Sequence, residues 1–197
     1  MNEEWYGGIE PLLVSGAMMG EITDCDRKIV KSQLNKDPRG LIDIPVRCIY
    51  GYPVVLTTRP LIRDGDEFEI FPTLYWLSCP KRVEEVSRIE SGGYVKKLDK
   101  EIASDSELKE KYSKAEKRYL KAQKSLLSER DKRFIEKKGL KSALSRGIGG
   151  IKSDEHLKCL HLHLAHQLAD ENVLGKLIQK RFDLGDCSSD HVRCEKF

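Results

Sequence analysis

The sequence lacks the short motifs that identify many enzyme classes. It contains no GxxxxGK(S/T), GxGxxG, GxSxG or HExxH, which disfavours the nucleotide-binding and hydrolase classes that depend on such local signatures. CxxC is also absent although the chain has six cysteines, so the commonest zinc and redox signature is missing. Evidence for function must therefore come from residues that are scattered along the chain.

Long apolar runs and a strong net charge are absent as well. No apolar run approaches the roughly 20 residues of a membrane-spanning helix, and Glu3 and Glu4 stand where a signal peptide would begin with basic residues. We therefore expect a cytoplasmic protein without a membrane partner, whose cysteines are mostly free thiols. The formal net charge of +3 is too small to indicate a nucleic-acid partner by itself.

The chain does contain a short β region followed by many helices. Alternating apolar residues over 41–58, interrupted by a Gly-Tyr-Pro turn, predict a hairpin in which Pro45 favours an edge strand. Capping residues and apolar stripes predict further helices over 24–34, 80–90 and 173–182. We predict an α+β fold, in which a small antiparallel β unit is packed by several helices.

The domain organisation follows from the same pattern. Residues 24–184 are expected to form a single α+β domain. Residues 1–23 are expected to be an N-terminal appendage that packs its aromatic residues on this domain, and residues 185–197 a C-terminal tail.

The segment 94–140 is expected to form a long helical hairpin with a break near 104–106. Its apolar seam is spaced as in a short coiled coil: Leu108, Tyr112, Ala115, Tyr119, Ala122 and Leu126. Residues 96–141 contain 16 basic and nine acidic residues, a net charge of +7. Pairs such as Glu107–Lys111 and Glu110–Lys114 favour a solvated face, and the alternative is an interaction module that binds protein or nucleic acid through these helices.

Residues 153–170 contain four of the five histidines and are predicted to form a buried helix capped by Ser153 or Asp154. Leucines form one face, whereas the other carries His156, Cys159, His163 and His166. On a regular helix His161 points some 160° away from Cys159. We therefore expect these two residues not to share a ligand.

Three motifs resemble one family. They are Arg47-Cys48 with Gly51-Tyr52-Pro53, then Phe71-Pro72-Thr73-Leu74-Tyr75 with Leu77-Ser78-Cys79-Pro80, then Lys158-Cys159-Leu160-His161 with Ala165-His166. In this order they resemble the bacterial family catalogued as domain of unknown function 501, over roughly residues 26–177. The resemblance implies a fold and a shared site but no activity. From these motifs we expect Cys48, Thr73, Cys159 and His166 to bind a small ligand.

Cys79 is the candidate catalytic residue. It directly precedes Pro80, which suits the first position of a helix, and a thiol at a helix N-terminus tends towards a lowered pKa. These features indicate a thiolate nucleophile or a metal-bound thiolate. The alternative is a small buried residue that caps the helix.

A metal site is the second possibility. Cys159 and His163, one helical turn apart, would supply two ligands, and Cys48 and Cys79 are the obvious further donors. Zinc is the expected metal for this set. The alternative for the histidines is that they are hydrogen-bonded core residues. Cys187, His191 and Cys194 form a third potential metal-binding group, in a polar stretch that reads more simply as a tail.

Overall fold

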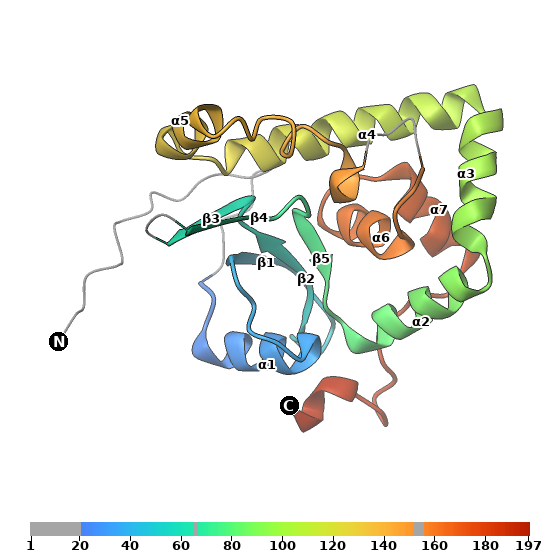
Figure 1. The fold of residues 1–197 in the computed structure, drawn as a ribbon. Coiled ribbons are helices and arrows are strands. Elements are labelled where there is room, and N and C mark those ends of the chain that lie inside the picture. The colour runs from blue at the N-terminus through green and yellow to red at the C-terminus, as the bar shows by residue number, and fades with distance from the viewer. Residues whose placement is uncertain (1–20, 65–66, 152–155) are drawn as a thin grey trace.

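The computed structural model describes residues 21–64, 67–151 and 156–197, so the predicted appendage lies almost wholly outside the described residues. The fold is α+β, as predicted (Figure 1). Its elements in chain order are α1 (Asp24–Leu34), β1 (Leu41–Arg47), β2 (Pro53–Thr58), β3 (Leu61–Asp64), β4 (Glu67–Ile70), β5 (Tyr75–Leu77), α2 (Pro80–Ser91), α3 (Tyr94–Ser104), α4 (Ser106–Ser125), α5 (Glu129–Lys137), the 3-10 turn η1 (Ile148–Gly150), α6 (Leu160–Ala169), α7 (Val173–Arg181) and the 3-10 turn η2 (Arg193–Lys196).

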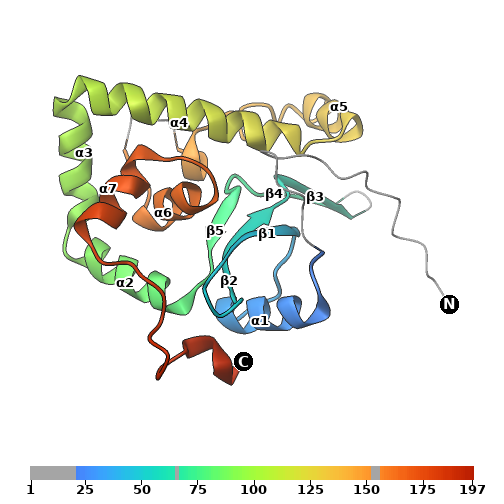
Figure 2. The ribbon, with the colours of Figure 1, turned by 180° about the vertical axis from the view of Figure 1, so that it is seen from behind.

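A three-stranded antiparallel sheet of order β1-β2-β5 lies at the centre. Pro45 is on β1, which is an edge strand as predicted, because proline cannot donate a ladder hydrogen bond. β2 is buried along its whole length, since helices cover both faces. Leu56 packs with Val30 of α1, whereas the next residue to it, Val55, points to the opposite face and packs in the main core with residues of α6. Figure 2 shows α1 and α6 on different sides of the sheet.

The helix α6 lies between the sheet, α2 and α7. Leu160, Leu164 and Ala165 are fully buried there. The prediction that this helix begins near Ser153 was wrong in its boundary. The helix α6 begins at Leu160, and Cys159 is its N-cap residue, with an extended backbone. The predicted capping residues, Ser153 and Asp154, lie outside the described residues. The chain enters α6 in a non-helical conformation, and the first helical N–H, that of Leu160, donates to Glu90 on α2 instead of to a local cap.

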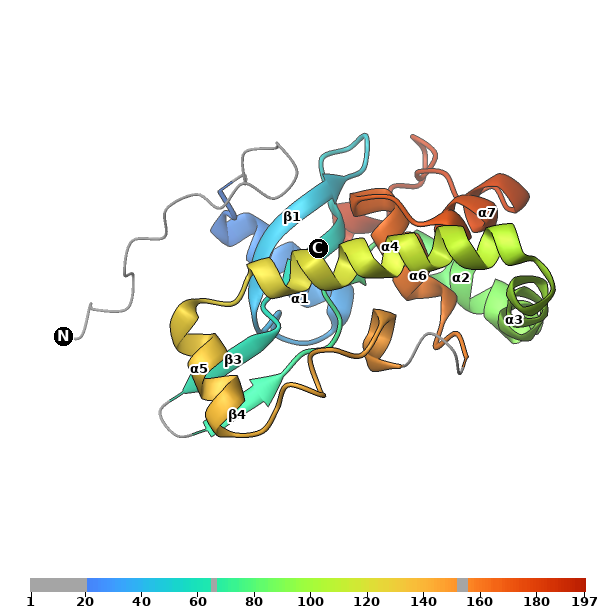
Figure 3. The same ribbon diagram turned by 90° about the horizontal axis from the view of Figure 1, so that it is seen from above.

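The segment predicted to be a helical hairpin consists of three successive helices. α3 and α4 meet at a corner, and α4 then runs along the top edge of the molecule in Figure 1 to α5. Seen from above, α4 crosses over the other elements between α3 and α5 (Figure 3). Four residues of the predicted seam are buried, and the last two, Ala122 and Leu126, are partly buried and pack against the main core. The Tyr119 hydroxyl accepts the N–H of Leu74 at 2.6 Å, which ties α4 to the sheet. At the far end, Leu61, Ile135 and Leu144 form a small core separate from the main one.

The last thirteen residues pack against α1, α2 and the β1–β2 turn. Arg82 pairs with Asp186 at 2.9 Å, and Gln33 donates to the Cys194 sulfur at 3.4 Å. All six cysteines are free thiols. None of the helices in the described ranges is long and apolar enough to span a bilayer.

Candidate functional site

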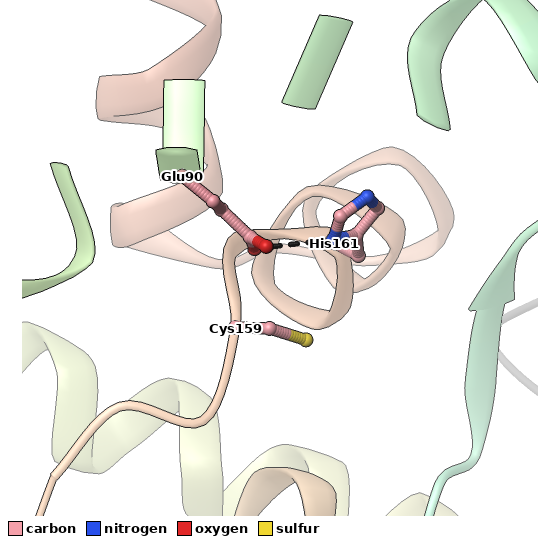
Figure 4. Close-up of side chains that lie close together, drawn as sticks. All are labelled: Glu90, Cys159 and His161. Atoms are coloured by element: carbon pink, nitrogen blue, oxygen red, sulfur yellow. Dashed lines mark hydrogen bonds and ion pairs between the residues drawn. The ribbon is translucent and has the colours of Figure 1, made fainter. Parts of the chain in front are cut away.

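Three side chains that could ligate a metal meet where α2 ends and α6 begins. Glu90 comes from the last turn of α2, Cys159 is the N-cap residue of α6, and His161 is in the first turn of α6. One ligand atom from each residue lies within 4.8 Å of the other two (Figure 4). Within the residues that the structure describes, this is the one place where three such side chains come together.

Both ring nitrogens of His161 have partners. Nδ1 lies 3.1 Å from Glu90 Oε1, and Nε2 lies 3.1 Å from the carbonyl oxygen of Val83. A carbonyl only accepts, so Nε2 carries a proton and donates it. Nδ1 is therefore the nitrogen that faces the carboxylate.

The electrostatics of the cluster favour a charged imidazole. Burial lowers the pKa of His161, but the hydrogen bond with Cys159, the charge of Glu90 and the Val83 carbonyl outweigh burial and raise that pKa to about 8. At neutral pH the ring is then mainly an imidazolium, with a proton on Nδ1 between a carboxylate and a thiol. The His161 and Glu90 side chains are each 23% exposed, so the cluster is accessible from solvent.

Glu90 also has a structural role. Its Oε1 accepts the N–H of Leu160, the first residue of α6, and Cys159 makes no side-chain cap bond. An acidic group at a helix N-terminus satisfies a free N–H and interacts favourably with the helix dipole. Glu90 thus fixes where α6 begins and brings its carboxylate beside His161.

The predicted separation of Cys159 and His161 was wrong. That prediction placed both residues on one regular helix, on which they point in opposite directions. Cys159 instead has φ −162° and ψ 157°, an extended conformation. Because Cys159 is outside the helix, its side chain and that of His161 are directed to the same place (Figure 4).

His163 and His166 are core residues, which was the simpler interpretation of their pattern. They are 1% and 0% exposed. The Asn172 amide lies 3.4 Å from Nδ1 of His163 and 3.0 Å from Nδ1 of His166. Burial lowers the pKa of His163 to about 3, and burial also lowers the pKa of His166 despite the nearby Asp170 carboxylate. Burial therefore disfavours the charged form of both rings.

Cys79 lies at the N-terminus of α2, as predicted. The expected direction of its pKa was wrong, because burial raises the pKa of this thiol. The backbone N–H groups of Lys81 and Arg82 and the charge of Arg82 oppose that effect only in part. Glu90 is eleven positions further along the same helix, or about 16 Å. The structure therefore does not bring Cys79 together with the cluster at the other end of α2.

Cys48 follows the last residue of β1 and is half-buried. Burial raises the pKa of Cys194, and the neighbouring thiols of Cys79, Cys48 and Cys187 raise it further. The thiols near the start of α2 are thus neighbours of the C-terminal segment, whereas Cys159 is at the other end of the helix. No three His, Cys or acidic groups of this second region lie close enough to share an ion among the described residues.

Thr73 is buried beside the sheet, where its carbonyl accepts the hydroxyl of Thr58 at 2.8 Å. This hydrogen bond holds the connection between β4 and β5 against the end of β2. His191, the histidine of the C-terminal CxxxHxxC stretch, is exposed.

Ser87 lies 3.3 Å from His161 Nε2, so Ser87, His161 and Glu90 have the order of a hydrolase triad. The serine hydroxyl, however, donates to the Val83 carbonyl at 2.8 Å. In a working triad the serine donates its proton to the imidazole. Here Nε2 is itself the donor, so this arrangement does not activate the serine.

A family model described as protein of unknown function (DUF501) matches residues 44–180. The chain therefore belongs to this family. No curated protein and no solved structure matches the chain.

Proposed function

We propose that this member of the DUF501 family binds a single zinc ion through Glu90, Cys159 and His161 and uses it to bind or activate a small ligand. The three donors are a carboxylate oxygen, a thiolate sulfur and an imidazole nitrogen, a combination that suits zinc. Their mutual separation of at most 4.8 Å is close to the spacing of ligands around one ion.

The hydrogen bond from His161 Nε2 to the Val83 carbonyl carries this proposal. Histidines that ligate metals almost always donate their other ring N–H to a carbonyl or carboxylate, which fixes the tautomer and the ring orientation. At 3.1 Å the Val83 carbonyl meets this requirement and leaves Nδ1 directed at Glu90. Zinc then takes the place of the proton on His161 Nδ1, and Cys159 binds as a thiolate.

This exchange makes zinc affinity depend on pH. The pKa of His161 is raised to about 8, so at lower pH a proton must leave Nδ1 before zinc binds. The histidine alone is expected to weaken binding by about tenfold for each pH unit below 8. The Cys159 thiol also loses a proton to the solvent when zinc binds, which steepens the dependence.

Three protein ligands leave one coordination position for water or a small ligand, as in catalytic zinc sites. A zinc-bound water has a pKa near 7, and the ion polarises carbonyl and phosphoryl oxygens. The partial exposure of Glu90 and His161 gives a small ligand access to this position. Metal-assisted hydrolysis or Lewis-acid activation is the reaction class that this arrangement fits.

Zinc titration against a chromophoric chelator tests the proposal on untagged, metal-free protein. We expect one tight site, weakened by more than about 100-fold in Cys159→Ser and in His161→Ala. His156→Ala and Cys187→Ser are matched controls, because each removes one exposed or half-exposed group of the same type outside the cluster. Unchanged affinity in Cys159→Ser and His161→Ala, with folding preserved, contradicts the proposal.

A further inference from the structure

The positive charge of the chain is concentrated in one segment. Residues 117–146, here called the basic arm, carry eleven basic and three acidic residues, a net charge of +8, whereas the whole chain carries +3. The rest of the molecule is thus negative, with a net charge of −5. The basic arm consists of the second half of α4, the whole of α5 and the segment that follows it.

The acidic residues of the basic arm are already paired. Glu129 bonds Lys132 at 2.6 Å, Glu136 bonds Lys141 at 2.5 Å, and Asp131 lies 3.8 Å from Arg63. Eight basic side chains of the arm have no acidic partner within 4.0 Å in the described part of the chain: Lys117, Lys121, Lys124, Arg130, Arg133, Lys137, Lys138 and Arg146. This excess charge is available to a negatively charged partner.

The basic arm also contains an apolar groove of about 430 Å³. It is lined by Lys124, Leu127, Lys132, Ile135, Lys141, Ser142, Leu144 and Ser145. Ile135 and Leu144 are buried in the small core at this end of the molecule, and Leu127 packs against them. The three lysines are exposed, so the groove combines an apolar floor with positively charged residues around it.

We propose that this groove docks an acidic amphipathic helix of a partner protein. Such a helix places leucine-like side chains on the floor and carboxylates beside the lysines, which is the common helix-in-groove mode of recognition. Lys117, Lys121 and Lys124 share one exposed face of α4 and extend the positive charge over about 10 Å. The exposed pairs at Lys132 and Lys141 are weak, so an incoming carboxylate can replace Glu129 and Glu136.

Nucleic acid fits this surface less well. A phosphate backbone interacts with cations but leaves an apolar floor unused. Phe134 is the one aromatic residue of α5, and it lies between Phe68, at 5.4 Å between ring centres, and Arg63, at 4.7 Å. It is therefore not free to stack on a base. The helix α5, which carries part of the groove lining, is also remote from α2 (Figure 1), so the proposal does not depend on zinc.

Fluorescence anisotropy with three labelled probes tests the proposal. The probes are an 18-residue Glu/Leu peptide with helical spacing, a scrambled peptide of the same composition, and a 20-base-pair DNA duplex. We expect the amphipathic peptide to bind at least about tenfold more tightly than the other two, a difference of about 1.4 kcal/mol. Equal binding of the two peptides, tighter binding of the duplex, or no binding of any probe overturns the proposal.

Substitutions then locate the binding surface. Lys121→Glu/Lys124→Glu is expected to weaken peptide binding by at least about tenfold, whereas Lys100→Glu/Lys109→Glu, with the same charge change on exposed residues nearer the corner of α3 and α4, should change it less than about twofold. Ser142→Trp fills the groove from an exposed position and should also abolish binding without disturbing the core. Full affinity in Ser142→Trp, or equal losses in both double variants, overturns the proposal.

Discussion

His161 and His163 are two residues apart on α6, yet their environments are opposite. The pKa of His161 is raised to about 8, whereas that of His163 is lowered to about 3. His161 lies at the partly exposed start of the helix beside a carboxylate and a thiol. His163 is buried in the core, where it contacts the ring of Tyr112 and lies near His166. The same residue type is thus a candidate ligand at one position and a core residue at the other.

The difference lies in the partners of Nδ1. In His163 and His166 this nitrogen accepts from the Asn172 amide, and its lone pair is not available to an ion. In His161 it carries a proton that faces Glu90 and that a metal can replace. A histidine-rich helix therefore need not be a metal-binding helix, and each ring must be judged by what its two nitrogens contact.

The largest effect on stability is expected from Asn172→Ala. The Asn172 amide bonds both buried histidines, and its Oδ1 caps α7 by accepting from Leu174 and Gly175 at 3.0 and 3.1 Å. The substitution leaves buried groups without partners, at a cost of about 2–4 kcal/mol. Urea unfolding measures this cost. In metal-free protein His161→Ala should cost less than about 1 kcal/mol, and equal losses in the two variants would remove the distinction between core and site.

Acid is expected to destabilise the folded protein through the two core histidines, His163 and His166. Because the folded protein lowers the pKa of His163 and His166, the unfolded state binds more protons below pH 6.5, and stability falls as the pH decreases towards 3. His163 contributes up to about 1.4 kcal/mol per pH unit between pH 6.5 and about 3, and His166 acts in the same direction. Urea unfolding at pH 7, 6 and 5 should show this slope. His163→Leu should make it shallower, and an unchanged slope would show that this ring is protonated in the folded protein.

His161 contributes to the pH dependence of folding stability with the opposite sign. Its folded pKa of about 8 lies above the unfolded value of 6.5, so its contribution to stability is complete below pH 6.5 and is lost as the pH rises through 8. The smallest predicted effect sharpens this point: Glu90→Gln should lower the pKa of His161 by about one unit or less, because one of several favourable partners loses its charge. NMR titration of the ring protons measures the shift. Glu84→Gln, on the same helix, should leave this pKa unchanged.

The sequence predicted those elements whose signals are local. Thr23 caps α1 through a reciprocal bond with Asp26, Pro80 occupies the first position of α2, and the Gly-Tyr-Pro turn separates β1 from β2. Each signal lies within a few residues of the structure that it specifies. The small antiparallel sheet, its proline-bearing edge strand and the seam of α4 followed from such patterns.

The site was only partly predictable because its decisive contacts are not local. Glu90 is 71 positions before His161, and no spacing connects them. The start of α6 depends on that same carboxylate, so the sequence around Ser153 gave no sign that Cys159 lies outside the helix. Cys79 shows the same limit: the helix terminus is a local feature that lowers a pKa, but tertiary burial raises it more.

Cobalt substitution tests the central claim most directly. Cobalt replaces zinc in protein sites, and a cobalt–thiolate bond gives an intense near-ultraviolet charge-transfer absorption. We predict one equivalent of Co²⁺ with this absorption, lost in Cys159→Ser and retained in Cys79→Ser. Loss in Cys79→Ser with retention in Cys159→Ser would place the metal at the other end of α2 and contradict the assignment of Glu90, Cys159 and His161 as its ligands.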